Sequence, residues 1–531
     1  MINLIFFEGY LIVKDVFLDE NKSRRHLSSL LNSQNLETVF QHLNGSFRFS
    51  FEKDEIVYFT SDHFSGYPLF YQLDDFKIIK NPYLEKNKRI SDVNLLEFLT
   101  FGYTIGEKTI YENIYECDPG VLYSYSKDGN LLKKYVWFEY SYESKKKYKE
   151  KYLAEILTKS VKPFISENLF LPLTAGLDTR TLLAINLNLN HFPEVFSNGK
   201  HNNPDVEIAK EITEHFGLKF HLNEYDENSS KLYFQDSDFK KMVENAFWGR
   251  SLPHDLEWIS VKKLPQNSRV ISGHSGDWIS GSYLSKELLN LKSTEKVISY
   301  IINRNPSLTG ISSKKHKNII FNSVKKYISK KTQSSLLSTS EIFEFENHQR
   351  KYNINSAWIY RGEGKESYLP FFDRRLISLF KDLRISDKIN EKFYIETLKA
   401  EIFVNNAKDL SQIKTSRSEF YSQPKSESSI KFKLVDLINT FDWKRKRKIF
   451  SKPNQRWEEV ISLFDESPRE FYSKKIKDAF PEISKSIKYL EKINATESAS
   501  HLKIISNYRI SQIQINGLFV LKMLPYILEI R

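Results

Sequence analysis

Short apolar runs alternate with helical segments between residues 165 and 285, and this order constrains the fold of the 531-residue chain most. "NLFLPLT" precedes one helical pattern, and "EVFSN" precedes "DVEIAKEITEHFG", in which Ile208, Ile212 and Phe216 follow helical spacing. "SRVISG" then leads into another loop. Alternating strands and helices predict parallel strands joined by crossover helices. We therefore predict a doubly wound α/β sheet here, and mostly helical sequence beyond residue 285.

The first 140 residues follow a different, β-rich pattern. "SFRFSFEKDEIVYFTSD" alternates on both sides of a charged turn, and "GVLYSYSKDGNLLKKYVWF" turns at Asp128-Gly129. A charged segment, "SYESKKKYKEKY", follows. We predict an antiparallel β-rich domain over residues 1–145 and a second domain over residues 146–531, which makes the fold class α/β and α+β.

Bulk composition excludes several classes of protein. The single cysteine, Cys117, rules out a disulfide within the chain and a cysteine-based metal site. The N-terminus lacks the basic region of a signal peptide, and the apolar stretch "LFVLKMLPYILEI" is too short to span a membrane, so we expect a cytoplasmic protein. The formal charge of +12 can attract anions, but the chain is rich in lysine throughout. We interpret the basic run 444–448 as a solvated face.

One loop at a predicted strand end has the residues of an anion site. In "LPLTAGLDTRTLLA", Gly176 lets the backbone approach an anion, and the helix that follows offers free N–H groups. The hydroxyls of Thr174 and Thr179 can donate to phosphate oxygens. Asp178 would repel a bare phosphate, so it fits only with a divalent cation between them. The other interpretation is an ordinary strand-to-helix turn with a capping aspartate.

Two more loops could join the first, because ligands of open parallel sheets bind at the carboxyl ends of the strands. "SGHSGDWISGSY" carries Gly273 and Asp277, which together with the first loop could hold Mg²⁺ against a triphosphate. "GKESYLPFFDRRLI" carries Glu366 beside an apolar segment. The alternatives are a surface turn for the second loop and a buried loop with capping acids for the third.

Seven segments, in order from about residue 40 to 425, resemble motifs of the asparagine synthetase family. "LTAGLDTR" is similar to its "SGGLDS" pyrophosphate loop, "SGHSGD...SGSY" to "SGEGSDE...GGY", and "ESYLPFFDRRLI" to "EARVPFLD". "GKHNNPDVEIAKEITEHFGLKFH" and "FLTFGYTIGEKTIYENIYECDPGVLY" resemble its intervening strand–helix unit and its linker. "LNGSFRFSF" and "SDHFSGYPLFY" resemble its glutaminase domain.

The resemblance implies an Ntn-type, glutaminase-like first domain and an ATP-pyrophosphatase second domain with extra helices. That family uses ATP and Mg²⁺ to convert a carboxylate into an acyl-adenylate, which an amine then attacks. The resemblance implies metal ligands at Asp178 and Asp277. The residues it implies for ATP and pyrophosphate are Leu173, Thr174, Ala175, Gly176, Asp178, Thr179, Ser197 and Gly273. Ala175 replaces a glycine of the motif, so it must tolerate a backbone conformation that glycine usually supplies, unless its φ is negative.

Departures from the family motifs bear on the amine donor. Glutamine-hydrolysing members have cysteine directly after the initiator methionine, whereas this chain has Ile2. Ser61 replaces the arginine of the "RDHLG" motif. Because isoleucine cannot act as a nucleophile, we expect the first domain to lack glutaminase activity. The amine would then be ammonia from solution, ammonia from another protein, or an amine on the substrate.

Two more pairs of residues are predicted to be catalytic. His274 stands where asparagine synthetases have glutamate and β-lactam-forming relatives have tyrosine, and Glu366 matches the partner of that tyrosine. A His–Glu pair could deprotonate an attacking amine; the alternative is a solvent-facing loop histidine. In "KTSRSEF", Arg417, with Lys414 nearby, matches the lysine that stabilises the acyl-adenylate transition state.

The sequence therefore predicts an ATP-dependent amide-forming ligase of asparagine synthetase type, with ATP and Mg²⁺ as cofactors. Its substrate would be a small-molecule, peptide or sugar carboxylate, and a protein that supplies ammonia or carries the substrate is a further partner. Asparagine synthesis itself, lactam or peptide cyclisation, and an adenylating tRNA-modifying activity are the alternatives. Nucleic acid is a disfavoured partner, because the first domain is foreign to tRNA-modifying enzymes. A non-catalytic binding protein is disfavoured because both aspartates are present.

Overall fold

The computed structural model describes residues 2–73, 76–199, 201, 203–224, 241, 243–251, 261–305, 310–331, 335–413, 483–506, 524–525 and 527–528. Its N-terminal part is a six-stranded antiparallel sheet in the order β2-β1-β3-β4-β8-β9. These strands are β1 (Asn3–Val13), β2 (Val16–Leu18), β3 (Gly45–Lys53), β4 (Ile56–Ser61), β8 (Val121–Ser126) and β9 (Leu131–Val136). The predicted hairpin at Asp128-Gly129 joins β8 to β9.

Alternation of side chains along these strands gives the sheet two buried faces. Phe47 and Phe49 pack on the face covered by α1 (Glu20–Ser33) and α2 (Leu36–His42). On the other face, Phe59 and Tyr123 pack against Tyr71 of a second, three-stranded sheet. That sheet has the order β6-β5-β7, with β5 (Phe70–Gln72), β6 (Lys77–Ile79) and β7 (Ile114–Glu116). The predicted antiparallel β-rich part is confirmed.

The second part is built on a five-stranded parallel sheet in the order β12-β11-β10-β13-β14. Its strands are β10 (Leu169–Pro172), β11 (Glu194–Gly199), β12 (Phe220–Glu224), β13 (Arg269–Ile271) and β14 (Glu366–Tyr368). The chain runs outward from β10 to β12 and then returns to the other side of β10. The point between β10 and β13 is therefore the topological switch point, where ligands bind in such sheets.

Helices cover both faces of this sheet. Leu169, Leu171 and Val195 face α4 (Glu150–Val161), α5 (Leu177–Asn188) and α6 (Pro204–Phe216). Phe170 and Val270 point the other way and pack with Ile359 of α15 (Ala357–Gly362). The predicted doubly wound α/β architecture is thus confirmed. The division at residue 145 falls between β9 and α4 and stays a prediction.

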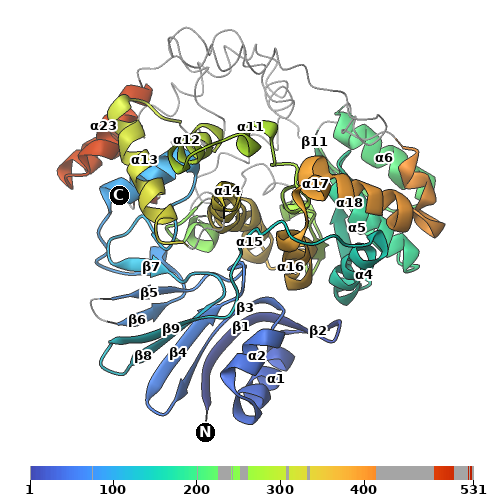
Figure 1. Ribbon diagram of the computed structural model, residues 1–531, viewed down its shortest axis with the longest axis horizontal. Helices are drawn as coiled ribbons and strands as arrows, with labels where there is room; N and C mark the ends of the chain where they lie inside the picture. The colour runs from blue at the N-terminus through green and yellow to red at the C-terminus, as the bar shows by residue number, and fades with distance from the viewer. Residues whose placement is uncertain are drawn as a thin grey trace.

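Helical segments surround the parallel sheet (Figure 1). They include α3 (Asp92–Phe101), α10 (Gly276–Ser280), α11 (Lys286–Leu289), α12 (Thr294–Arg304), α13 (Lys314–Ile328), α14 (Leu336–Phe343), the π-helix η4 (Glu344–Asn353), α16 (Arg374–Asp382), α17 (Ile385–Lys388), α18 (Lys392–Thr397) and α23 (Thr496–Ser506). Late in the chain, α23 lies beside α3 and α13.

The third predicted loop joins the two parts of the molecule. The imidazole Nε2 of His63 lies 2.7 Å from the carbonyl oxygen of Phe372, and Asn44 donates to Asp373 at 3.0 Å. Arg374 donates to the carbonyl oxygen of Phe40 at 2.7 Å. Asp373 also caps α16 through the backbone N–H of Arg375. The interpretation of this loop as a buried segment with a capping acid is therefore the one the structure supports.

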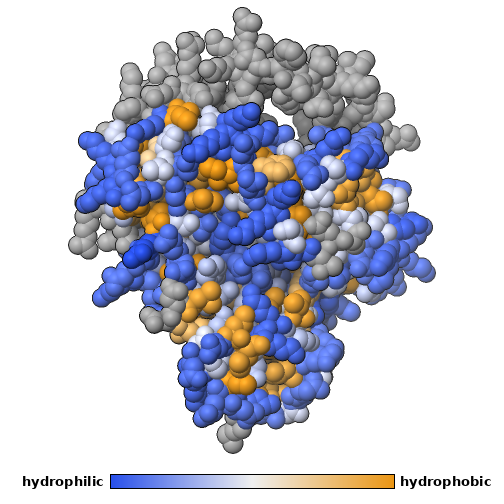
Figure 2. Space-filling model, turned by 60° about the vertical axis from the view of Figure 1, so that its left-hand side comes forward, coloured by the Kyte–Doolittle hydropathy of each residue, from blue (hydrophilic) through white to orange (hydrophobic). Residues whose placement is uncertain are grey.

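One edge of the N-terminal sheet is exposed. Figure 2 shows hydrophobic side chains on the lower part of the molecule, where this sheet lies. Leu131, Leu132 and Val136 of the edge strand β9 are 47%, 52% and 55% exposed. Lys133 and Lys134 lie between these apolar residues on the strand, and charged side chains on an edge discourage further strand pairing. Among the described residues, no helix is both long enough and apolar enough to span a membrane.

Candidate active site

The first predicted loop connects β10 to α5 and is stabilised by its own hydroxyls. The Thr174 hydroxyl accepts from the backbone N–H of Gly176 at 3.1 Å, and the Thr179 hydroxyl accepts from that of Thr174 at 3.3 Å. The two hydroxyl oxygens are 3.3 Å apart. One hydroxyl hydrogen can serve this last contact, so the other can donate to a ligand.

The start of α5 has the geometry of an anion site. Gly176 is its N-cap residue, and no side chain caps the helix there. The first-turn N–H groups and the positive end of the helix dipole therefore face the loop. Asp178 lies in this first turn and is half-buried. A carboxylate beside the N-terminus of a helix can hold a divalent cation against a phosphate.

The second predicted loop connects β13 to α10 and approaches the first loop closely. A Cβ atom added to Gly276 would lie 2.6 Å from Cγ of Asp178, and one added to Gly273 would lie 3.2 Å from the backbone N of Thr179. Both glycines are thus needed for the approach, although neither has a positive φ. Ser275 between them does have a positive φ of 66°, and its hydroxyl donates to Gln349 at 2.5 Å.

The two aspartates that the sequence predicts as metal ligands lie together. The backbone N–H of Asp277 donates to Oδ2 of Asp178 at 2.9 Å. The Asp277 side chain accepts from the backbone N–H of Trp278 at 2.7 Å and from the hydroxyl of Ser282 at 3.4 Å. Among the described residues, no group of three or more histidine, cysteine, aspartate or glutamate side chains is placed to hold a metal ion. Two carboxylates suit Mg²⁺, whose remaining ligands are usually waters and substrate phosphates.

Two residues that the sequence did not predict support the first loop. Tyr394 of α18 is buried, and its hydroxyl donates to Oδ1 of Asp178 at 3.3 Å and lies 2.8 Å from the Thr181 hydroxyl. Burial, together with the Asp178 carboxylate, raises the pKa of Tyr394 well above its usual range, so the phenol keeps its proton. Asp205, in the first turn of α6, accepts from the backbone N–H of Ala175 at 2.9 Å. The sequence signal for Asp205 is its position in the segment that resembles the family's intervening strand–helix unit.

The remaining residues predicted to bind nucleotide lie on neighbouring strand ends. Leu173 follows β10 and is buried, and its carbonyl oxygen accepts from the Ser197 hydroxyl of β11 at 2.5 Å. Ala175 is also buried, and its φ is not positive, so the alanine fits the loop without strain. Contact of Leu173 and Ser197 with a nucleotide stays a prediction.

The structure does not bring His274 and Glu366 together. Glu366 begins β14 at the amino edge of the sheet, opposite Arg269, which donates to it at 2.6 Å. Tyr368 also donates to Glu366, at 2.5 Å. His274 follows the carboxyl end of β13, where its Nδ1 contacts the Ser272 hydroxyl. The strand length separates the two residues, so the proposed His–Glu base pair is not present. Lys414 and Arg417 lie outside the described residues.

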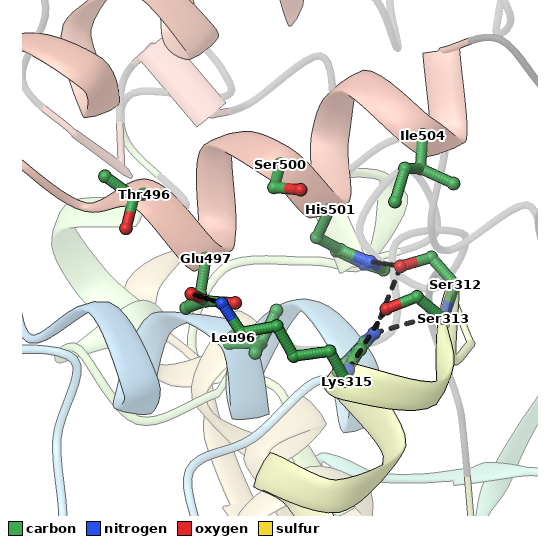
Figure 3. Close-up of a pocket in the computed structure, with 10 residues that line it drawn as sticks. Leu96, Ser312, Ser313, Lys315, Thr496, Glu497, Ser500, His501 and Ile504 are labelled. Carbon is green, nitrogen blue, oxygen red and sulfur yellow. Dashed lines mark hydrogen bonds and ion pairs between the residues drawn. The ribbon is translucent and has the colours of Figure 1, made fainter.

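A pocket of about 250 Å³ lies elsewhere, between α3, α13 and α23 (Figure 3). His316 and His501 line it with ring centroids 4.4 Å apart, and both contact the Ser312 hydroxyl. Lys315 and Glu497 form an ion pair at its rim. None of its lining residues belongs to the loops that follow β10 and β13.

Comparisons with known proteins find remote likeness only. No family model matches the sequence, and no curated protein matches it. Among solved structures, the NMN synthetase from Francisella tularensis is 15% identical, with a TM-score of 0.19, and the match covers 38% of this chain and 94% of that chain. A glutamine-dependent NAD+ synthetase from Acinetobacter baumannii, in complex with ADP, is 13% identical, with a TM-score of 0.17 and coverages of 49% and 60%.

Proposed function

We propose that this chain is an ATP-dependent ligase that activates a carboxylate as an acyl-adenylate and passes the acyl group to an amine. The observation that carries the proposal is the contact between the two loops at the switch point, where Asp277 donates its backbone N–H to Asp178 at 2.9 Å. Glycines at 273 and 276 permit that contact. An aspartate pair beside an uncapped helix N-terminus fits a triphosphate and a divalent cation together.

The chemistry of the proposed reaction matches the charges at the site. A carboxylate oxygen of the substrate attacks the α-phosphorus of ATP, and the bond to the pyrophosphate oxygen breaks. Negative charge then develops on the pyrophosphate, and the N–H groups of α5 and one threonine hydroxyl would stabilise it. Mg²⁺, bound through Asp178 and Asp277, would neutralise the phosphate oxygens. An amine then attacks the acyl carbon and releases AMP.

The proposed reaction uses an amine that is not released from glutamine by this chain. Ile2 is buried, and its backbone N–H donates to Asn32 at 3.0 Å. Cys117 offers no replacement nucleophile, because burial raises the pKa of its thiol well above the usual value. We therefore propose ammonia or a substrate amine as the nucleophile. Ammonia release from glutamine by the pure protein, and its loss in Cys117→Ser, would contradict this part.

Exchange of labelled pyrophosphate into ATP tests the proposal directly. We expect exchange with one class within a panel of amino acids, uronic acids and peptide carboxylates. Asp178→Ala and Asp277→Ala should each lower the exchange rate at least a hundredfold, because charge on the pyrophosphate is then left unneutralised. Asp128→Ala, at the exposed β8–β9 turn, is the matched control and should leave the rate unchanged. Absence of both exchange and Mg·ATP binding would refute the ligase and favour a non-catalytic binding protein.

A further inference from the structure

The position of the phosphate site restricts where the rest of a bound nucleotide can lie. The two loops follow β10 and β13 at the centre of the sheet. On one side, the segment after β14 is closed, because Phe372 stacks on Phe64 at 4.7 Å between ring centroids and is buried. On the other side, the side chains of His201, two residues beyond β11, and Glu224, the last residue of β12, are 78% and 47% exposed. Among the described strand ends beside the two loops, those of β11 and β12 are therefore the open ones for a nucleoside.

A pair of asparagines stands at that position. Asn198 and Asn223 are register partners, each one residue before the end of its strand. The Asn223 amide Nδ2 donates to Oδ1 of Asn198 at 3.1 Å, and Asn223 is only 4% exposed. This hydrogen bond fixes which way each amide faces. Asn198 is left with its NH₂ group, and Asn223 with its carbonyl oxygen.

These two groups are a ready donor and acceptor. The hydrogen bond that joins the pair uses the other two atoms. Within the part of the chain that the structure describes, the Asn198 amide nitrogen and the Asn223 carbonyl oxygen make no hydrogen bond. Neighbouring strands are about 4.8 Å apart, so side chains on two of them can both reach one planar ligand. Adenine offers an N6 donor beside the N1 acceptor. Guanine has an acceptor, O6, where adenine has the N6 donor.

We propose that Asn198 and Asn223 recognise the adenine base and exclude guanine. The inference rests on the proposed function, because that function supplies the nucleotide. Asn198 would donate to N1, and Asn223 would accept from the N6 amino group. A fixed donor–acceptor pair discriminates strongly, because the wrong base leaves two polar groups facing like groups. The pair would thus select the base from β11 and β12, on the side of the sheet away from β14 and the third loop.

Nucleotide binding to the full chain tests this assignment without any acyl substrate. Calorimetry would compare Mg·ATP, Mg·GTP and Mg·tripolyphosphate, the last of which has no base. We expect the wild type to prefer ATP over GTP at least tenfold. Asn198→Asp replaces the donor by an acceptor and should weaken ATP binding about tenfold or more while leaving tripolyphosphate unchanged. Asn168→Asp, at the amino edge of the same sheet, is the matched control.

The three ligands separate failure of this inference from failure of the proposed function. If tripolyphosphate binds and Asp178→Ala abolishes its binding, the phosphate site stands. If Asn198→Asp then keeps the wild-type preference for ATP over GTP, the assignment of the asparagines is wrong. If no ligand binds the wild type, the proposed function itself falls. Asn223→Leu is the second variant. Thermal unfolding of each variant checks folding, and a variant that lowers the melting temperature without changing the ATP:GTP ratio identifies a purely structural pair.

Discussion

Asp178 has a position that neighbouring residues impose on it. Tyr394 donates to one carboxylate oxygen, and the backbone N–H of Asp277 donates to the other. Thr181 lies 2.8 Å from the Tyr394 hydroxyl and so holds the phenol in turn. Support of this kind fixes the direction in which a carboxylate presents its lone pairs to a cation. At the scale of single residues, the site therefore depends on groups that would touch neither ATP nor metal.

Tyr394→Phe tests this support. The variant removes only the hydroxyl, so we expect about tenfold weaker binding of Mg·ATP, and a loss of about 1 kcal/mol in the free energy of unfolding. Calorimetry at varied Mg²⁺ and urea unfolding measure the two effects. Tyr142→Phe is the control, because it removes a buried hydroxyl bonded to the carbonyl oxygen of Leu383 at 2.8 Å, away from the site. Equal Mg·ATP affinity in both variants would show that Tyr394 does not position Asp178.

Gly276 is a second residue on which the site depends. In Gly276→Ala the new methyl group would lie 2.6 Å from Cγ of Asp178, so the carboxylate must move away from Asp277. We expect loss of Mg·ATP binding and a destabilisation of about 1–3 kcal/mol from overpacking. Gly217→Ala is the control, because it strains the backbone without crowding any neighbouring atom. Gly217 has φ +64° with nothing within 4 Å of an added Cβ, so it should cost about 1 kcal/mol through backbone strain and leave binding intact.

At the scale of elements, α23 is attached to α3 and α13 through polar contacts around two histidines (Figure 3). Asp92 of α3 accepts from the backbone N–H groups of Glu497 and Ser498 at 2.8 Å each. His316 contacts Thr100 of α3 at 2.8 Å. Burial lowers the pKa of His316 from 6.5 to about 4, and burial with His316 nearby lowers the pKa of His501 well below its usual value. Both rings are therefore neutral at pH 7.

The packing of α23 on α3 and α13 should weaken in acid. A histidine whose folded pKa is depressed contributes stability that is full above pH 6.5 and is lost as the pH falls towards the folded value, near 4 for His316. Between pH 6.5 and pH 5 the loss through His316 alone is about 2 kcal/mol. His316→Gln should therefore show a smaller drop in unfolding free energy between pH 7.5 and pH 5 than the wild type. His42→Gln, at an exposed position, should follow the wild type. An equal drop in all three proteins would exclude this role.

How far the sequence predicts these elements depends on whether the signal is local. The strand–turn–helix at residues 169–188 is predictable because apolar runs flank a glycine turn. The meeting of Asp178 and Asp277 follows because carboxyl ends of parallel strands share one edge. The separation of His274 from Glu366 does not follow, because nothing local shows that β14 begins at Glu366. Tyr394 is 216 residues from Asp178, and no spacing rule connects them.

At the scale of the whole molecule, the two parts share a buried ionic cluster. Glu116 of β7 accepts from Arg250 at 2.6 Å and from Arg350 at 2.8 Å, and Lys351 lies 3.2 Å from its other oxygen. All four side chains are buried. Burial alone would raise the pKa of Glu116, but the three cations outweigh it and lower the pKa to about 2. The carboxylate belongs to the N-terminal strands, while Arg350 and Lys351 lie on η4, so the cluster couples both parts.

Replacing this carboxylate should destabilise the molecule as a unit. Glu116→Gln leaves Arg250 and Arg350 buried without a counter-charge, which costs about 3–5 kcal/mol in comparable buried pairs. Lys351 adds less to this cost, because burial already lowers its pKa to about 7 and it can lose its proton. Because the cluster spans both parts, we expect urea unfolding to remain one transition at a lower midpoint. Tryptophan fluorescence and far-ultraviolet circular dichroism would both monitor this transition. Glu52→Gln removes a partially exposed partner of Lys127, 3.0 Å away, and should leave the midpoint nearly unchanged, because water screens the pair. Two separate transitions in Glu116→Gln would show that the N-terminal sheets and the parallel sheet unfold independently, with the cluster as their main coupling.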